Sequence, residues 1–145
     1  MVGYTRLMQQ DETQAKLLRD RQRNVVDKSI ADHNGRVMQY YGDGTLSMFS
    51  SAIKAVEAAQ EIQNELKKDP QVPLRIGIHI GDVVHDEEGV FGDAVNVAAR
   101  VQSLSVPGGV MISGKVFEEI KNHPGIKVEA FGEHDLKNVF NPIPS

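Results

Sequence analysis

The turn Gly42-Asp43-Gly44 is the first place in the sequence where the residue types suggest chemistry. Its glycines leave room for a bulky ligand to approach the backbone, and a carboxylate is a ligand that Mg²⁺ prefers. The motif therefore suits a site where a cation and a phosphate group meet. Asp-Gly is also a favoured sequence for an ordinary hairpin turn, so a purely structural role stays open at this point.

The pair Asn96 and Arg100 offers an amide and a guanidinium four residues apart. On a helix this spacing puts both side chains on one face. That face differs from the apolar stripe that includes Ala94 and Val101. An amide and a guanidinium together can hold a hydroxyl and a phosphate. A solvated polar helix face is the alternative interpretation.

The segment Val2-Gly3-Tyr4-Thr5 is the third candidate, because backbone N–H groups at a glycine turn can hold phosphate oxygens. An ordinary strand exit is the alternative. The five histidines are scattered without an i, i+4 pair, which argues against a histidine metal site. The basic residues between positions 16 and 23 are predicted to form a solvated helix face. The sequence contains neither a Gly-x-Ser-x-Gly elbow nor a P-loop.

The sequence predicts alternating helices and strands, and these elements must position the candidate residues named above. Apolar stripes predict helices over residues 11–34, 51–67, 93–104 and 113–121. Short β-prone runs predict a hairpin of residues 36–41 with 45–49, a pair of residues 74–80 with 83–85, and strands 110–112 and 126–131. Residues 1–8 are expected to be the end of a strand, residues 86–89 an acidic loop, and residues 138–145 a tail without a closing element.

This order predicts an α+β fold with a ferredoxin-like βαββαβ core, in which helices pack against a mixed, mostly antiparallel sheet. The 145 residues are expected to form one domain, and the net charge of −4 argues against binding to nucleic acid. The absence of cysteine fits a cytoplasmic protein. No apolar run is long enough to insert into a membrane.

Four segments in order resemble the catalytic domain of class III adenylate and guanylate cyclases, in the bacterial branch of that family. They are Val2–Met8, Tyr41–Gly44, Leu74–Asp82 and Phe91–Arg100, and two shorter segments, Pro107–Ser113 and Leu136–Asn138, fit as well. The resemblance covers almost the whole chain. It implies conversion of a nucleoside triphosphate to the 3′,5′-cyclic monophosphate and pyrophosphate in intracellular signal transduction, with ATP favoured over GTP and the choice of base left open by the residues that would read it.

The resemblance also implies roles for individual residues. Asp43 matches a metal-binding aspartate in a site with two Mg²⁺ or Mn²⁺ ions. In such a site the two ions hold the attacking hydroxyl and the phosphates. Asn96 matches the amide that orients the ribose, and Arg100 the guanidinium that stabilises the transition state. The turn that holds the β- and γ-phosphates matches Gly3, Tyr4 and Thr5. In the family these groups come from two chains, so a homodimer with two interfacial sites is implied, with regulatory domains attached in the parent protein.

The sequence departs from the family pattern at the positions that read the base, which align with Gln39 and Gly89. The first metal-binding aspartate of the family would fall one residue before Met1. We therefore expect either a domain cut at both ends from a longer protein or the true loss of that ligand. The main alternative is a catalytically silent domain that dimerises and regulates attached modules, with or without a bound nucleotide. A diguanylate cyclase is disfavoured, because residues 41–45 lack its signature hairpin.

Overall fold

The computed structural model describes residues 1–131 and 135–139 of the chain. Its helices are α1 (Tyr4–Gln10), α2 (Glu12–Asp32), α3 (Ala52–Leu66), α4 (Asp93–Leu104) and α5 (Gly114–Ile120). Its strands are β1 (Arg36–Tyr41), β2 (Gly44–Met48), β3 (Ile76–Ile78), β4 (Val84–Asp86), β5 (Gly89–Phe91), β6 (Val110–Ser113), β7 (Val128–Phe131) and β8 (Leu136–Val139). This mixture of elements confirms the predicted α+β class.

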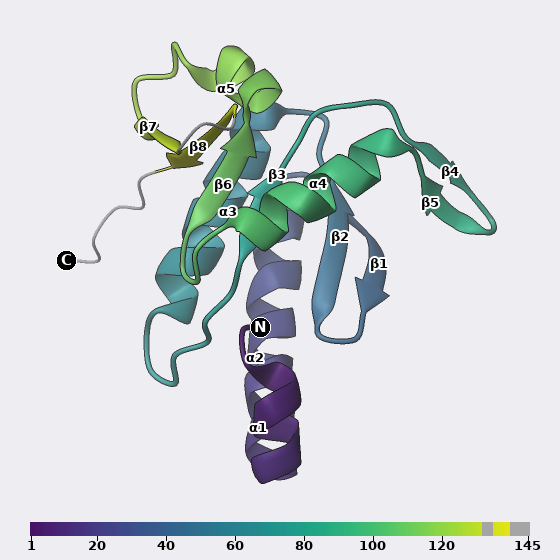
Figure 1. Cartoon of the computed structure of the whole chain (residues 1–145), viewed down its shortest axis with the longest axis vertical. Coiled ribbons are helices and arrows are strands. Elements are labelled where there is room, and N and C mark those ends of the chain that lie inside the picture. Colours follow the sequence, from purple (N-terminus) through teal and green to yellow (C-terminus); the bar gives the residue numbers. More distant parts are fainter. Residues whose placement is uncertain (132–134, 140–145) are drawn as a thin grey trace.

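The described strands pair in three groups. β3 lies parallel to β6, and β8 and β7 extend that sheet with antiparallel pairing. The hairpins β1–β2 and β4–β5 are separate from it and from each other (Figure 1). The pairing is mixed and mostly antiparallel, as predicted, but it is distributed over three sheets.

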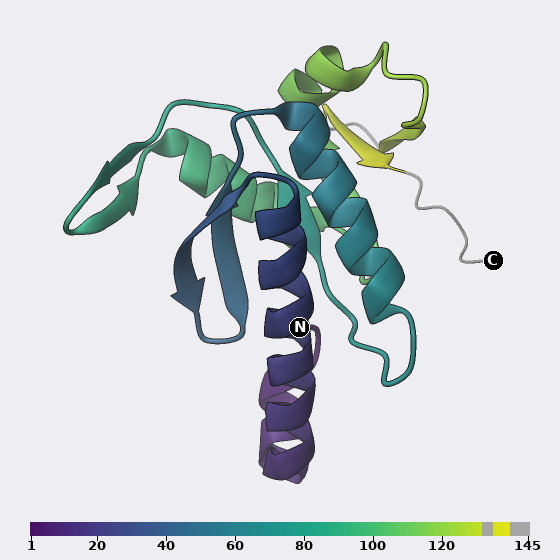
Figure 2. The ribbon, with the colours of Figure 1, turned by 180° about the vertical axis from the view of Figure 1, so that it is seen from behind.

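Helices cover both faces of the sheet that contains β3 and β6. α4 crosses one face (Figure 1), and α2 and α3 lie side by side behind it (Figure 2). One core cluster joins α3 to the sheet and α5, and its buried members are Val56, Ala59, Val110, Ile112, Val116, Ile120 and Val139. A second joins α2, α3 and the segment before β3, with buried Val26, Ile30, Ile62, Leu66, Val72 and Leu74.

The helices begin and end close to the positions that the apolar stripes predict, within two residues at each end. Asp11 caps α2 by accepting a hydrogen bond from the backbone N–H of Gln14 at 3.1 Å. Ser51 caps α3 in the same way, accepting from the N–H of Lys54 at 3.2 Å. Such caps each stabilise a helix by about 1 kcal/mol.

The start of the chain differs from the prediction. Residues 1–8 were expected to end a strand, but α1 begins directly after Gly3. Gly3 has a φ of 78°, a left-handed conformation that glycine adopts without steric cost. α1 then lies along the first part of α2 (Figure 1).

The predicted pairing of residues 74–80 with 83–85 is wrong. Residues 76–78 pair with the distant strand β6, and Val84–Asp86 pairs with Gly89–Phe91. The expected acidic loop is thus part of a short hairpin. Gly81 does not make a strand turn but allows α4 to approach, because a Cβ at this position would lie 2.6 Å from the Cβ of Ala94.

The prediction that no element closes the chain is also wrong for part of the tail. Leu136–Val139 forms β8, which lies between β6 and β7. Leu136 and Val139 are both buried, so the strand contributes to the core. Residues 140–145 of the predicted tail lie outside the described residues.

Among residues 1–131 and 135–139, no helix is both long and apolar enough to cross a lipid bilayer. The longest, α2, has 21 residues but carries many charged side chains along its length.

Candidate functional site

The turn between β1 and β2 presents the Asp43 carboxylate beside the start of the chain. Tyr41 pairs with Gly44 in the hairpin register, so Gly42 and Asp43 form the turn, and Gly42 has a φ of 53°. Oδ2 of Asp43 accepts a hydrogen bond from the α-ammonium group of Met1 at 2.5 Å. The hairpin prediction is confirmed, and the carboxylate at its tip lies against the backbone nitrogen of residue 1.

The Met1 contact brings the glycine turn at residues 3–5 to the same place. The N–H of Val2 donates to the carbonyl oxygen of Pro73 at 2.7 Å, which anchors the chain start to the segment before β3. No side chain caps the N-terminus of α1. The backbone amides at Gly3, Tyr4 and Thr5 are therefore free of a side-chain cap, and they lie two to four residues along the chain from the atom that contacts Asp43.

The donor set around Asp43 fits one carboxylate ligand of a divalent cation. Carboxylate oxygens are the ligands of Mg²⁺ and Mn²⁺, which commonly keep water and phosphate oxygens as their other ligands. Within the described part of the chain, no group of three or more histidine, aspartate or glutamate side chains could enclose a metal. A cation on Asp43 would therefore complete its coordination mainly with substrate and water oxygens.

Asn96 and Arg100 lie on the outer face of α4, and both side chains are exposed. Neither has a hydrogen bond or ion pair with another side chain in residues 1–131 and 135–139. The opposite face of the helix is apolar: Val101 is 3% exposed and packs with Met111 of β6. The pairing of an amide and a guanidinium on one free helix face is as predicted.

A glycine sets how closely α4 approaches the sheet. A Cβ added at Gly77 of β3 would collide with the backbone of Gln102 on α4. The helix therefore rests directly on the strand, and the height of Asn96 and Arg100 above the sheet depends on the absence of that side chain.

The two candidate groups are separate within one chain. In both views the chain start and the β1–β2 turn lie near each other, while α4 crosses the molecule nearer the opposite end of that hairpin (Figures 1 and 2). The metal and phosphate candidates thus form one group, and Asn96 with Arg100 forms another.

The two positions aligned with base recognition do come together. A Cβ added at Gly89 of β5 would lie 3.8 Å from Oε1 of Gln39 on β1. Gln39 is exposed, and its Oε1 accepts a hydrogen bond from the Tyr41 hydroxyl at 3.2 Å. The hairpins β1–β2 and β4–β5 thus form a shared surface around one glutamine amide.

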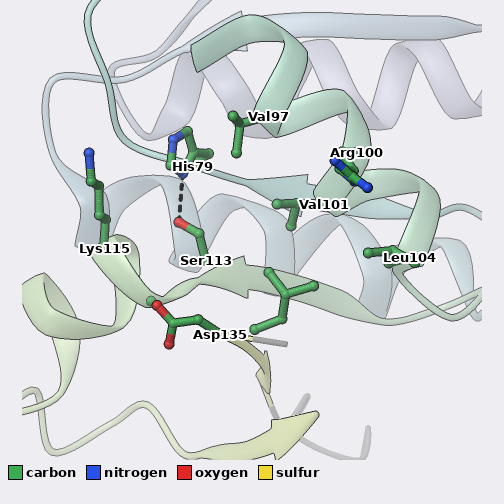
Figure 3. Close-up of a pocket in the computed structure, with 10 residues that line it drawn as sticks. His79, Val97, Arg100, Val101, Leu104, Ser113, Lys115 and Asp135 are labelled. Atoms are coloured by element: carbon green, nitrogen blue, oxygen red, sulfur yellow. Dashed lines mark hydrogen bonds between the residues drawn. The ribbon is translucent and has the colours of Figure 1, made fainter. Parts of the chain in front are cut away.

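A cavity of about 310 Å³ lies under α4, lined by Val97, Arg100, Ser113 and Lys115 among others. Figure 3 shows His79 and Ser113 side by side in its lining, with 2.8 Å between Nδ1 and Oγ. Burial lowers the pKa of His79 below its ordinary value of 6.5, Lys115 lowers it further, and Asp93 opposes the shift. Scattered histidine positions in the sequence carry no signal of this contact.

The basic residues of α2 are not simply a solvated face, contrary to prediction. Arg21 donates hydrogen bonds to the carbonyl oxygens of Glu65, Lys68 and Pro70 around the C-terminus of α3. Arg23 donates to the carbonyl oxygen of Gly42 at 3.1 Å. The charge pattern alone does not reveal which arginines reach the backbone of distant segments.

Comparison with known sequences identifies the family. Residues 35–141 match the family model described as the adenylate and guanylate cyclase catalytic domain. The chain belongs to this family. Its resemblance to class III cyclases is therefore confirmed, and the exposed α4 face and the β1–β2 turn are parts of a cyclase domain.

Relatives in this family extend over nearly the whole chain. "Putative adenylate cyclase 3" of Rhizobium meliloti is 39% identical over 150 residues, which cover 98% of this chain and 26% of the relative. The chain thus spans about a quarter of that protein. An adenylate/guanylate cyclase/hydrolase from Silicibacter pomeroyi has a crystal structure with 30% identity and a TM-score of 0.78, covering 97% of this chain and 91% of that one.

Solved cyclase domains of this fold include dimers and parts of fusion proteins. A non-canonical dimeric guanylyl cyclase domain of the RhoGC fusion protein from Blastocladiella emersonii has a TM-score of 0.79 over 97% of this chain and 89% of that chain. At 19% identity, this likeness concerns the fold alone.

Proposed function

We propose that the chain is the catalytic domain of a nucleotidyl cyclase that converts ATP to the 3′,5′-cyclic monophosphate and pyrophosphate in the cytoplasm. In this reaction the ribose 3′-oxygen bonds to the α-phosphorus, the bond from that phosphorus to the β-phosphate oxygen breaks, and the hydroxyl proton leaves to solvent. The observation that carries the proposal is the free amide and guanidinium on α4 in a chain that also presents Asp43 beside a glycine turn.

The Asp43 region would bind the phosphate and metal part of the substrate. Asp43 would hold Mg²⁺ or Mn²⁺, and the family pattern has two such ions per site. A bound cation would neutralise phosphate charge and lower the pKa of the attacking hydroxyl. The backbone amides of Gly3, Tyr4 and Thr5 would donate hydrogen bonds to the β- and γ-phosphates. Their position beside Asp43, through the Met1 contact, supports this assignment.

The outer face of α4 would act on the reacting atoms. The Asn96 amide would orient the ribose so that its 3′-oxygen lies in line with the leaving group. The Arg100 guanidinium would stabilise negative charge on the pentacoordinate phosphorus. Because this face and the Asp43 turn lie apart in one chain, we propose that two copies pair head to tail and that each site combines the two groups from different chains.

The choice of ATP over GTP rests on the Gln39 amide. Its Oε1 already accepts one hydrogen bond, from the Tyr41 hydroxyl, whereas its NH₂ group has two donors and no partner among the described residues. Adenine presents an acceptor at N1, whereas guanine presents an N–H there, so a donor matches adenine. Gly89 adds no side chain to this contact. The adenylate cyclase named above among the relatives agrees with this preference.

The proposal is tested by incubating the chain with Mn²⁺ and either ATP or GTP and resolving the products by mass. We expect cyclic AMP to be the main product. A folded dimer that forms no cyclic product would instead be a silent regulatory domain that dimerises and binds a nucleotide. The parent protein would then use this domain to control attached modules.

The shared site is tested by mixing two inactive variants. Asp43→Ala and Arg100→Ala chains should each be inactive or nearly so, and their mixture should regain part of the activity through one intact site per heterodimer. Asp32→Ala, which removes an exposed carboxylate on α2, is the matched control and should retain activity. No recovery, with heterodimers demonstrated, would overturn the two-chain arrangement.

A further inference from the structure

Two neighbouring residues of α2 hold successive carbonyl groups of the Asp43 turn. Nε2 of Gln22 donates a hydrogen bond to the main-chain oxygen of Asp43 at 2.5 Å. The guanidinium of Arg23 donates to the main-chain oxygen of Gly42 at 3.1 Å. Both bonds join residues far apart in the chain, so they tie the tip of the hairpin to the helix behind it.

Gln22 is unusual for a polar side chain because it is only 3% exposed. The Asp43 carbonyl is the acceptor of its Nε2, and its Oε1 has no hydrogen-bond partner in the part of the chain that the structure describes. Burying an amide without satisfying both ends costs free energy. An apolar side chain of the same size would fill this space without that cost. The one hydrogen bond that the Gln22 side chain makes is with the backbone of the proposed metal ligand.

Arg23 also connects α2 to the end of β1, next to the turn. Its guanidinium lies over the ring of Tyr40 at 4.2 Å, an arrangement that favours a cation–π interaction. The Tyr40 hydroxyl donates in turn to Asp27, one turn further along α2. The end of β1 is thus connected to α2 through two polar contacts of Tyr40.

These contacts matter for the direction of the hairpin tip because no neighbouring strand holds it. β1 and β2 pair with each other and with no other described strand. The direction of the tip therefore depends on the side chains that reach it from α2 and on the contact between Asp43 and residue 1. A shift of the tip would move the Asp43 carboxylate relative to the chain start, which holds the proposed phosphate-binding amides.

We infer that Gln22 and Arg23 are positioning residues that set the affinity of Asp43 for a divalent cation. The inference rests on the proposed function, since it assigns the metal to Asp43. A single buried hydrogen bond contributes about 5- to 30-fold to an equilibrium constant. Removing the Gln22 donor should weaken Mn²⁺ binding by about that factor, whereas saturating Mn²⁺ should restore most of kcat.

The chain offers a matched control in Gln63. It is fully buried, its Nε2 donates to the carbonyl oxygens of Leu74 and Gly109, and its Oε1 also lacks a partner in residues 1–131 and 135–139. Gln63 therefore resembles Gln22 in chemistry and burial but holds segments on the other side of α3. Gln22→Met and Gln63→Met remove the same donor at nearly constant volume.

The experiment measures the Kd of Mn²⁺ for the chain by electron paramagnetic resonance, with Asp43→Asn to identify the site. We expect Gln22→Met to raise this Kd about 5- to 30-fold. Gln63→Met should lower the Tm but leave the Kd within a factor of about two. An unchanged Kd in Gln22→Met, or an equal increase in Gln63→Met, would overturn the inference. If Gln22→Met does not fold, Arg23→Met at the partly exposed neighbour should still raise the Kd, and an unchanged Kd there would overturn it.

Hydrogen exchange separates this inference from the proposed function. Wild-type chain that binds no Mn²⁺ at Asp43 would remove the metal site from the proposed function. The hydrogen-exchange rates of the backbone amides at residues 42–44 would then show whether Gln22 holds the turn against α2. Gln22→Met should accelerate their exchange more than Gln63→Met does. Equal rates in the two variants would show that Gln22 does not hold the turn.

Discussion

The Asp43 turn and the outer face of α4 are held in place by different forces. The turn is attached to α2 through hydrogen bonds from Gln22 and Arg23 to its backbone. The helix is held by apolar packing of Val101 against β6 and by a close approach at Gly77. The strength of a hydrogen bond depends on the distance and angle between donor and acceptor. The stability of a packed contact depends on the volume of the side chains that fill it.

This difference means that each region can be disturbed without the other. Changes in donors on α2 should alter metal binding, and changes in volume under α4 should alter the chemistry carried by Asn96 and Arg100. In the proposed two-chain site, the two regions would come together only when a second chain pairs with the first. The following experiments test whether the two regions are as independent as their contacts indicate.

Removing the free guanidinium of α4 should have the largest effect. Arg100→Ala should lower kcat by a factor on the order of 10²–10³, as expected for loss of one donor to transition-state charge. Because the side chain is exposed and makes no hydrogen bond or ion pair with other described side chains, Tm and the Kd of Mn²⁺ should not change. Gln102→Ala, exposed on the same helix, is the control and should keep wild-type kcat. An unaltered kcat in Arg100→Ala would remove this residue from the reaction.

Adding a methyl group under α4 should have the next largest effect. Gly77→Ala should lower the free energy of unfolding by about 1–3 kcal/mol, because the helix backbone must move to admit the new Cβ. Denaturant unfolding measures this change, and kcat should fall while Mn²⁺ binding stays as in the wild type. Gly125→Ala is the control, since a Cβ there stays at least 3.4 Å from its neighbours. Weaker Mn²⁺ binding in Gly77→Ala would show that the two regions are coupled.

Exchanging the amide on β1 for a carboxylate should change nucleotide preference more modestly. Gln39→Glu replaces a donor by an acceptor, which matches the N–H of guanine, so the ATP to GTP ratio of kcat/KM should fall about tenfold. Steady-state assays with both nucleotides measure the ratio. Tyr40→Phe should keep the wild-type ratio, because that hydroxyl bonds to Asp27 rather than to Gln39. A ratio that does not respond to Gln39→Glu would place base recognition elsewhere.

The smallest effect should come from His79. Burial and Lys115 lower the pKa of the ring in the folded chain, so folding favours the neutral form. Its stabilising contribution is therefore complete above the ordinary pKa of 6.5 and decreases as the pH falls from there towards the lower folded-state value. The Tm should drop more between pH 7.5 and pH 5.5 in the wild type than in His79→Asn. Identical drops would show that another group controls stability in this range.

The helices could be predicted from the sequence because their signals are local. Apolar stripes and the caps at Asp11 and Ser51 define α2 and α3 almost to the residue. The pairing of Asn96 with Arg100 on a free face follows from the same periodicity. Residues 1–8 misled the prediction because their β-prone types are outweighed by the left-handed turn at Gly3.

Strand partners and long-range contacts could not be predicted in the same way. Nothing local distinguishes a turn at Gly81 from a glycine that admits α4, so β3 was paired with a neighbour instead of β6. Likewise, a glutamine and an arginine within a charged helix look solvated until the hairpin is folded against them. The positions of Gln22 and Arg23 therefore depend on tertiary structure that periodicity does not describe.

In the proposed site, the backbone at Gly89 would limit how nucleotide preference could change during evolution. Its φ of 134° lies in a region that residues with a side chain rarely adopt. A single substitution that introduces a carboxylate there would have to reshape β5 before it could contact a base. A single substitution at Gln39 meets no such obstacle, because that residue lies in a regular strand. In a site built from these two strands, changes of substrate would therefore begin on β1 and reach β5 only after its backbone had altered.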